Sequence, residues 1–238
     1  MASPTFPRVE AVRVPVRAGV LDANLTVPED AAGLVIFAHG SGSGRHSPRN
    51  QFVARALNEE QQATLLADLL TLDEERADRI TAHLRFDIEL LAGRLTELVD
   101  WAGQDSRLKS LPVGLFGAST GAAAALVAAA RRPQRIRAVV SRGGRPDLAR
   151  QSLAFVVAPT LLLVGGLDTE VLALNQWARR QLHGRSELEV IPGASHLFEE
   201  PGTLELVATC AAKWFAAQFN RRTNDTKGNA LTWKPHPL

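Results

Sequence analysis

A serine in a glycine-flanked turn is the residue of this sequence best suited to covalent chemistry. Residues 117–121 read Gly-Ala-Ser-Thr-Gly and fit the pattern Gly-x-Ser-x-Gly, with Ser119 at its centre. The apolar run 113–116 precedes this pattern and the alanine-rich run 122–130 follows it. A short apolar run is typical of a buried parallel strand, and alanine is the best helix former. A serine on the sharp turn between strand and helix is placed for nucleophilic attack.

Two further residues are suited to activating that serine. Asp168 and His196 each follow a short apolar run that predicts a strand. Ligands of open parallel sheets bind beyond the carboxyl ends of the strands, so we expect both side chains to lie near Ser119. A neutral imidazole at His196 would accept the serine proton, and Asp168 would hold the imidazole in the required tautomer. Glu170 is an alternative acid, and Asp168 is alternatively a plain helix cap.

Attack at a carbonyl group also requires hydrogen-bond donors for the oxyanion that forms. The amide of Thr120, at the start of the predicted helix, is one expected donor, because a helix N-terminus favours negative charge. The glycine-rich loop 39–44 is expected to provide the second donor, the amide of Ser41, with Gly42 as the alternative. We expect His39 to order this loop through hydrogen bonds.

Four basic side chains lie in loops expected at the same edge of the sheet. They are Arg45, His46, Arg142 and Arg145, and we interpret them as substrate-binding residues. Because a guanidinium binds a carboxylate bidentately, the arginines suggest the hypothesis of a substrate that carries a carboxylate. The alternative is that the arginines are solvated or pair with acids such as Asp147. No pair of histidines has the spacing of metal ligands, so we expect no metal and no cofactor.

The remaining segments predict the elements that position these residues. Alternating apolar residues predict antiparallel strands at 9–16 and 20–27, and apolar runs predict strands at 34–38, 63–70, 113–116, 136–141, 160–164 and 188–191. Helices are expected from residue 48 onward, over 84–102, 122–130, 171–182 and 204–215, and briefly after residue 147. Strands that alternate with helices predict one α/β domain with an eight-stranded, mostly parallel sheet and helices on both faces. The charged segment 72–83 is interpreted as a solvated loop, and the short connection 143–159 leaves no room for a substantial lid.

The order serine, aspartate, histidine, the Gly-x-Ser-x-Gly turn and the His-Gly loop after the third strand resemble the α/β-hydrolase fold family. Over about residues 9–219 the chain is similar to the dienelactone-hydrolase-like group, which has little or no lid. Dienelactone hydrolases carry a cysteine nucleophile, whereas Ser119 stands here. The resemblance implies a serine hydrolase, a carboxylesterase that cleaves small, short-acyl esters through an acyl-enzyme. A thioesterase, lactonase or peptidase with the same triad, or a non-catalytic ligand binder, remains an alternative.

Composition narrows the classes of function. The chain has 238 residues, 45% of them hydrophobic and 22% charged, as in an ordinary soluble domain. We expect a domain over 1–219 and a polar, disordered tail over 220–238. Four of the 27 basic and one of the 25 acidic residues lie in that tail, so residues 1–219 hold 23 basic against 24 acidic residues. This balance predicts no nucleic-acid partner.

The lengths of the apolar runs and the single cysteine indicate the cellular compartment of the protein. No apolar run approaches the roughly 20 residues that cross a bilayer, so no membrane association is expected. The lone cysteine excludes an internal disulfide, and residues 1–19 contain no apolar leader, so we expect a cytoplasmic protein. A small-molecule ester is the expected partner, and the sequence does not determine the oligomeric state.

Overall fold

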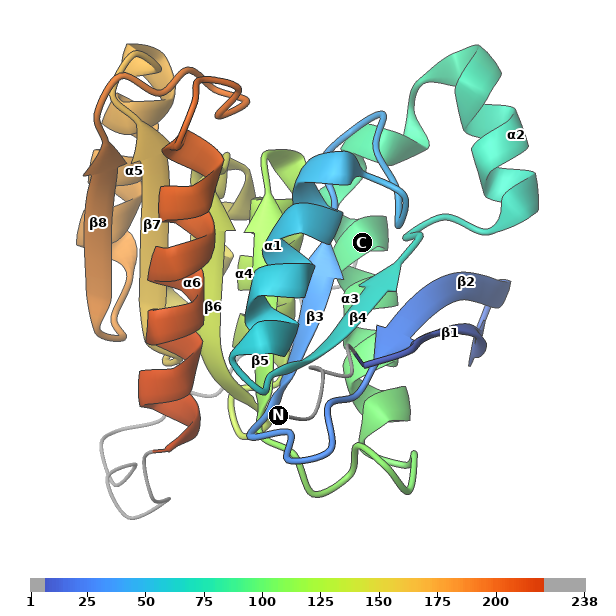
Figure 1. Cartoon of the computed structure of the whole chain (residues 1–238). Helices are drawn as coiled ribbons and strands as arrows, with labels where there is room; N and C mark the ends of the chain where they lie inside the picture. Colours follow the sequence, from blue (N-terminus) through green and yellow to red (C-terminus); the bar gives the residue numbers. More distant parts are fainter. Residues whose placement is uncertain (1–6, 221–238) are drawn as a thin grey trace.

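The computed structural model describes residues 7–220 and contains one eight-stranded sheet between layers of helices (Figure 1). The strands are β1 (Val9–Val16), β2 (Gly19–Thr26), β3 (Leu34–Ala38), β4 (Ala63–Ala67), β5 (Val113–Ala118), β6 (Ile136–Arg142), β7 (Thr160–Gly165) and β8 (Ser186–Ile191). Their order in the sheet is β1-β2-β4-β3-β5-β6-β7-β8. The pairs β1–β2 and β2–β4 are antiparallel, and the other pairs are parallel. The predicted mostly parallel sheet is confirmed.

Helices cover both faces of this sheet, as predicted. Helices α1 (Pro48–Glu59) and α6 (Thr203–Phe219) lie on one face, and α3 (Ile88–Ala102), α4 (Thr120–Arg131) and α5 (Thr169–Gln181) lie on the other. Strand β3 shows how the two cores arise. Its residues Val35 and Phe37 pack in the core under α1 and α6, and Leu34 and Ile36 pack in the core on the opposite face. Successive side chains of a strand point to opposite faces, so an unbroken apolar run serves both cores.

Helix α4 is the most deeply buried helix near the serine turn. Residues 121–130 are all buried, and eight of these ten residues, those at 122–125 and 128–130 together with Gly121, are alanine or glycine. Such small side chains allow the helix to pack closely against the sheet and against α3. The position of its first residue, Thr120, is therefore set by tight packing along the whole helix.

The expectation of a solvated loop at 72–83 is wrong, because this segment forms helix α2 (Leu72–Thr81). A capping box starts the helix: the Thr71 hydroxyl accepts a bond of 3.3 Å from the Glu74 amide, and Glu74 accepts one of 2.8 Å from the Thr71 amide. The charges then pair along the exposed helix, with Arg79 bonded to Glu75 at 3.0 Å. The Thr-x-x-Glu signature of a capping box is present in the sequence, but the high density of charged residues favoured the prediction of a loop.

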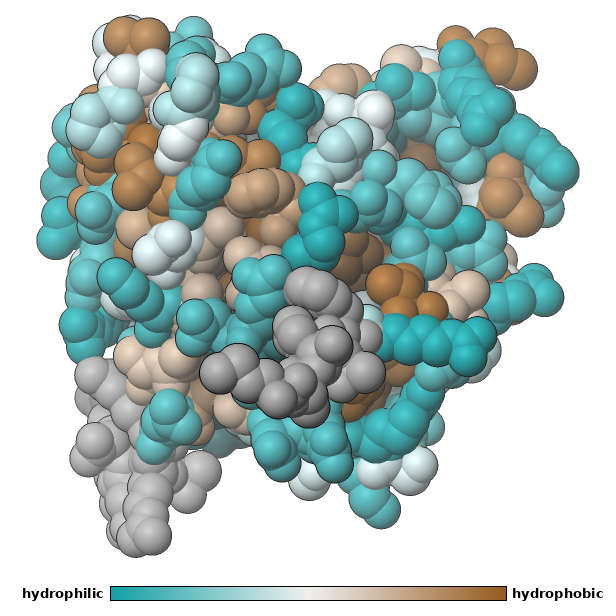
Figure 2. Space-filling model, viewed as in Figure 1, coloured by the Kyte–Doolittle hydropathy of each residue, from teal (hydrophilic) through white to brown (hydrophobic). Residues whose placement is uncertain are grey.

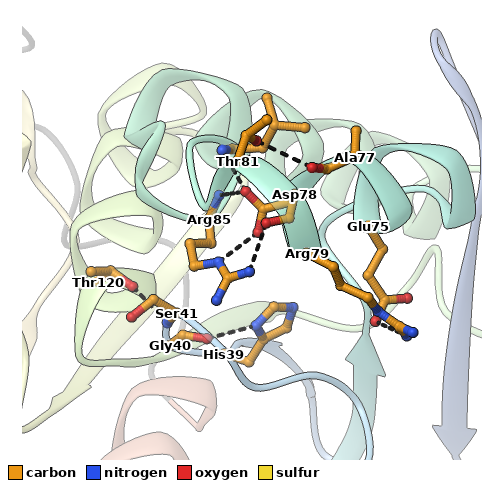
Figure 3. Close-up of polar contacts among 11 residues, drawn as sticks. His39, Gly40, Ser41, Glu75, Ala77, Asp78, Arg79, Thr81, Arg85 and Thr120 are labelled. Carbon is orange, nitrogen blue, oxygen red and sulfur yellow. Dashed lines mark hydrogen bonds and ion pairs between the residues drawn. The ribbon is translucent and has the colours of Figure 1, made fainter.

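A buried carboxylate reverses the chain after α2. Asp78 accepts hydrogen bonds from the amide of Leu84 at 2.7 Å and from Arg85 Nε at 2.6 Å (Figure 3). Burial opposes ionisation of this carboxyl, but the bonds from Arg85 and Leu84 outweigh it, and the pKa of Asp78 lies below its ordinary value. The 3-10 helix η1 (Leu84–Phe86) follows, and α3 starts at Ile88 rather than at residue 84, with Asp87 as its N-cap.

The second 3-10 helix, η2 (Pro146–Phe155), occupies most of the connection between β6 and β7. It packs against α4 and α5, so this connection does not cover the sheet edge as a lid. No helix within residues 7–220 has the length and apolar character to cross a bilayer. The tail predicted at 220–238 lies outside the described residues, apart from Asn220.

Candidate active site

Ser119 occupies a strained turn between β5 and α4. Its backbone dihedrals are φ 51° and ψ −121°, a conformation that costs a residue with a side chain about 1–3 kcal/mol. Neighbouring backbone groups enforce the turn. The Ser119 amide donates to the Arg142 carbonyl at 3.2 Å, and the Ser119 carbonyl accepts from the amides of Arg145 and Ala122, each at 3.1 Å. The strain is therefore held in place from both sides of the serine.

The two glycines of the motif have a steric reason. A Cβ atom at Gly117 would lie 2.4 Å from Cα of Ala122, and one at Gly121 would lie 2.2 Å from the carbonyl oxygen of Ala38. Both distances are shorter than side-chain atoms tolerate, so glycine permits the close approach of helix, turn and β3. A Cβ at Gly40 would lie 3.2 Å from Cβ of Ser119, which places the loop after β3 directly beside the serine.

The imidazole of His196 and the carboxylate of Asp168 form a close pair. His196 Nδ1 donates to Asp168 Oδ2 at 2.6 Å, and the two side chains are 39% and 14% exposed. This bond keeps the proton of the neutral ring on Nδ1, so Nε2 is the atom that can accept a proton. Asp168 is the N-cap residue of α5, but its side chain makes no capping bond. Of the two acids that the sequence left open, Asp168 contacts the histidine, while Glu170 is exposed.

Backbone bonds join the two loops that carry this pair. The amide of Leu167 donates to the Ala194 carbonyl at 2.9 Å, and the amide of Gly166 donates to the Ile191 carbonyl at 2.9 Å. A Cβ at Gly165 would lie 2.4 Å from the Ala194 oxygen, so the loops touch without room for a side chain. The distance between Asp168 and His196 is thus set by main-chain contacts.

Gly143 links the histidine loop to the serine turn. It follows Arg142, whose carbonyl binds the Ser119 amide, and a Cβ placed on it would lie 3.6 Å from Cε1 of His196. Ser119 and His196 therefore flank the end of β6. No hydrogen bond joins Ser119 Oγ to His196 within residues 7–220.

Sequence reasoning missed two residues that support the His196 loop. Glu200 accepts a bond of 3.0 Å from the Ser195 amide, and its bonds from Ser195 lower the pKa of Glu200. Phe198 is 2% exposed, has φ 56° and fixes the loop to the core beneath α6. The available signal was a large apolar residue and two acids directly after the histidine.

The two expected oxyanion donors meet at the start of α4. The Ser41 amide donates to Thr120 Oγ1 at 3.0 Å (Figure 3). Thr120 is the first residue of α4, so its own amide has no partner within the helix. The hydroxyl of Thr120 thus holds the Ser41 amide close to the residue that follows Ser119. Both amides are near the place where an oxyanion on a substrate at Ser119 would form.

His39 orders the adjacent loop, as expected. Its Nδ1 donates to the Gly40 carbonyl at 3.0 Å, and its Nε2 accepts from the Leu69 amide at 3.1 Å. Burial lowers the pKa of His39, which keeps the ring in the neutral form that these two bonds require. Arg85 projects from η1 toward the same loop (Figure 3), so α2 and η1 border the oxyanion side of the site.

The structure does not bring the four basic residues together. Arg45 bonds to Asp68 and lies 3.8 Å from Asp22, on the side of the antiparallel strands. Arg145 binds Asp147 bidentately, at 2.9 and 2.8 Å. For these two arginines the alternative expectation, pairing with acids, describes the geometry. His46 is exposed, and Arg142 is buried. Within residues 7–220 no group of three histidine, cysteine or acidic side chains is arranged to hold a metal ion.

The sheet order, the strained serine between β5 and α4, and the histidine–aspartate pair at the same edge are the features of an α/β-hydrolase fold. A dienelactone hydrolase from Anabaena variabilis is 55% identical in sequence, with a TM-score of 0.89 over 90% of this chain and 99% of that chain. The chain belongs to the α/β-hydrolase fold family, in its dienelactone-hydrolase-like group. No protein-family model matches the sequence.

Other relatives are longer or more distant. Two proteins from strains of Mycobacterium tuberculosis, provisionally named phosphoribosyl transferases, are 58% identical over 208 residues, which is 87% of this chain and 46% of theirs. The chain thus spans about half the length of these curated relatives. A serine hydrolase without a lid from Xanthomonas campestris is 21% identical with a TM-score of 0.71 over 92% of this chain and all of that one. At this identity the similarity shows the fold alone.

Proposed function

We propose that this chain is a serine ester hydrolase that cleaves small, short-acyl carboxylic esters through an acyl-enzyme. The observation that carries the proposal is the 2.6 Å bond between His196 and Asp168 on loops that flank the strained Ser119. Residues in sparsely populated backbone conformations cluster at active sites, where the strain serves the chemistry. The Anabaena variabilis relative, which is named a dienelactone hydrolase, supports hydrolysis as the reaction class.

The first half of the proposed reaction forms the acyl-enzyme. Ser119 Oγ attacks the ester carbonyl carbon while His196 Nε2 takes the hydroxyl proton. Asp168 keeps the ring oriented and stabilises the imidazolium that results. The tetrahedral oxyanion accepts hydrogen bonds from the amides of Thr120 and Ser41, and the N-terminus of α4 adds a favourable field. The C–O bond then breaks, and the imidazolium gives its proton to the departing alcohol.

The second half repeats these steps with water. His196 Nε2 takes a proton from a water molecule, which attacks the acyl carbon, and the same amides bind the second oxyanion. Collapse breaks the bond to Ser119 Oγ, which regains its proton from the imidazolium. The products are a carboxylic acid and the free enzyme. In both halves the Ser41 amide, which donates to Thr120 Oγ1 at 3.0 Å, would share its proton with the oxyanion while the Thr120 hydroxyl keeps the loop in place.

Thioesters, lactones and amides are open to the same machinery, because specificity comes from pocket contacts rather than from the triad. A non-catalytic ligand binder on this fold would not need the bonded pair of His196 and Asp168, which favours an enzyme. The name of the Mycobacterium tuberculosis relatives belongs to proteins about twice this length. We base the proposal on the site rather than on that name.

Covalent labelling tests the proposal directly. The protein is incubated with a fluorophosphonate probe and assayed with p-nitrophenyl acetate, and Ser119→Ala is compared with the wild type. We expect Ser119→Ala to lose labelling and to lose turnover by about 10⁴-fold or more, while its thermal unfolding midpoint stays close to that of the wild type. Ser110→Ala, an exposed serine in the turn before β5, is the matched control and should keep both activities. Labelling that persists in Ser119→Ala would contradict the assignment of the nucleophile.

A further inference from the structure

Arg142, the last residue of β6, is a buried cation without a counter-ion. The residue is 8% exposed, and its Nη1 atom is enclosed with no hydrogen-bond partner. The side chain of Arg142 makes no hydrogen bond or ion pair within residues 7–220. Arg45 and Arg145, the other arginines predicted at this edge, are both paired with carboxylates. Arg142 alone among the three has its binding capacity unused.

A second arginine faces Arg142 from the first turn of α1. Strand alternation directs the Arg142 side chain to the face that Ala138 and Val140 share with α1 and α6. Burial, and then the positive charge of Arg49, lower the pKa of Arg142 to about 10, so it stays charged at neutral pH. Arg49 pairs at 3.2 Å with Glu199, whose side chain is 63% exposed.

Unpartnered polar atoms also come from the start of α1. Arg49 Nε and Asn50 Oδ1 are enclosed without hydrogen-bond partners, and Asn50 is 2% exposed. Asn50 lies on the same face of α1 as the core residues Val53, Ala54 and Leu57. Buried polar groups are normally hydrogen-bonded, and a buried charge is normally paired. The unpartnered N–H groups of Arg142 and Arg49 mark a place where a negatively charged oxygen ligand would accept hydrogen bonds, whereas Asn50 Oδ1 is itself an acceptor that such a ligand would not satisfy.

This region adjoins the proposed catalytic residues. The carbonyl of Arg142 accepts the bond from the Ser119 amide, and the next residue, Gly143, approaches the ring of His196. We propose that Arg142, together with Arg49, forms a subsite for an oxyanion group, carboxylate or phosphate, carried by the ester substrate. The proposal rests on the proposed ester hydrolysis and narrows its substrate class to esters with a second, anionic group. A guanidinium binds such a group through two parallel N–H bonds.

A kinetic comparison of matched esters tests the subsite. The substrates are mono-p-nitrophenyl succinate, its neutral methyl ester, and a p-nitrophenyl ester that carries a phosphate. We compare the ratio of kcat/KM for each anionic ester to that for the neutral ester in the wild type, Arg142→Met, Arg142→Lys and Arg49→Gln. Loss of a hydrogen-bonded charge should lower this ratio about 10- to 100-fold in Arg142→Met, mainly through KM, and less in Arg49→Gln. The larger of the two ratios identifies carboxylate or phosphate as the preferred group.

Arg180→Gln is the matched control, because it removes one exposed arginine from the last turn of α5, at the opposite edge of the sheet. It should keep the wild-type ratio. Arg142→Lys keeps the charge but not the planar fork, so it should lie between the wild type and Arg142→Met. It also gives a result if Arg142→Met fails to fold. A ratio that is equal in the wild type and in every Arg142 variant would overturn the subsite.

A binding measurement separates this proposal from the proposed hydrolysis. Thermal unfolding is followed while succinate or inorganic phosphate is titrated into the protein. We expect a saturable rise of the unfolding midpoint in the wild type and in Arg180→Gln, and no rise in the Arg142 variants. A rise that persists in the Arg142 variants would mean an adventitious ion only and would overturn the subsite. If the wild type cleaves no ester but shows the Arg142-dependent rise, the proposed hydrolysis fails and the subsite stands.

Discussion

At the scale of single residues, the site depends on groups whose positions are fixed by main-chain contacts. The backbone of Ser119 makes three hydrogen bonds to its surroundings, at 3.1 to 3.2 Å. Such support is what allows a residue to persist in a conformation that costs about 1–3 kcal/mol. The His196 loop is held in the same way, by Glu200 and Phe198. Preorganised groups need no rearrangement as the reaction begins, and this is the main source of electrostatic catalysis.

Thr120 has a testable role at this scale. Its hydroxyl accepts the Ser41 amide at 3.0 Å and thereby anchors the loop after β3 beside the serine turn. In Thr120→Val the anchor is lost, the second oxyanion donor is no longer held in place, and we expect kcat on p-nitrophenyl acetate to fall about 10- to 100-fold. KM should change little, since a donor to the oxyanion acts in the transition state. Thr120→Ser keeps the hydroxyl and should retain most of the activity; an unchanged kcat in Thr120→Val would refute this role.

At the scale of elements, two segments border the loop that carries Ser41. Helix α2 and η1 form one side, joined by the bonds between Asp78 and Arg85. On the other side, the His39 side chain connects the loop to the segment after β4, because it bonds to the Gly40 carbonyl within the loop and to the Leu69 amide. The geometry of the loop, and with it the proposed second oxyanion donor, depends on a histidine that must stay neutral.

The neutral state of His39 predicts a pH dependence of stability. Burial lowers its pKa in the folded protein below the ordinary value of 6.5, which the unfolded chain retains. Above pH 6.5 both states are unprotonated, and the contribution of His39 to the free energy of unfolding is complete. As the pH falls below 6.5 the unfolded state takes up a proton first, so the free energy of unfolding decreases until the folded pKa is passed.

Urea unfolding of the wild type and of His39→Gln between pH 7.5 and 5 measures this effect. We expect the free energy of unfolding to decrease more steeply with falling pH in the wild type than in His39→Gln. The control is His183→Gln, which replaces an exposed histidine and should follow the wild-type curve. Parallel curves for the wild type and His39→Gln would show that His39 does not carry this dependence.

At the scale of the whole molecule, the carboxyl edge of the sheet is not covered by a lid. The β6–β7 connection is used by η2, which packs beside α4 and α5. Helix α2 projects from the body at one end of the sheet (Figure 1). On the face covered by α1 and α6, the space-filling view shows many hydrophilic residues, with hydrophobic residues at α2 and toward β7 and β8 (Figure 2). The exposed large apolar residues next to Asp168 and His196 in the sequence are Leu167 and Leu197, at 66% and 40% exposure. These two side chains offer a limited apolar surface to an acyl chain.

This shape predicts a preference for short acyl groups. Each methylene buried in a groove would contribute about 0.8 kcal/mol to binding, and an open site forgoes that gain. We expect kcat/KM along a series of p-nitrophenyl esters to be highest for acetate to butyrate and to show no increase at the concentration where the substrate forms micelles. The Ser119→Ala variant provides the background rate. A steady rise toward long chains, or a sharp increase with micelles, would reveal a lipase-like groove.

Local sequence patterns determined the strands, the serine turn and the order of the candidate triad. Short apolar runs such as 34–38 and 160–164 are typical of a strand buried on both faces, and both are such strands in the structure. In the Gly-x-Ser-x-Gly pattern the contact that requires Gly117 is local, with Ala122, whereas the contact that requires Gly121 is with Ala38 of β3, far away in the sequence. Helix α2 was missed even though its capping box is local, because its charged residues lack an apolar face that would signal packing.

Only the tertiary structure decided which polar side chains meet and which remain alone. The sequence placed Arg45, Arg142 and Arg145 in equivalent loops, and the fold paired two of them with Asp68 and Asp147 and buried the third without a partner. It likewise selected Asp168 over Glu170 as the partner of His196. The physical reason is that a charge interacts with whatever lies within a few ångströms, and those neighbours come from strands and loops far apart along the chain. Composition and spacing carry no information about such distances.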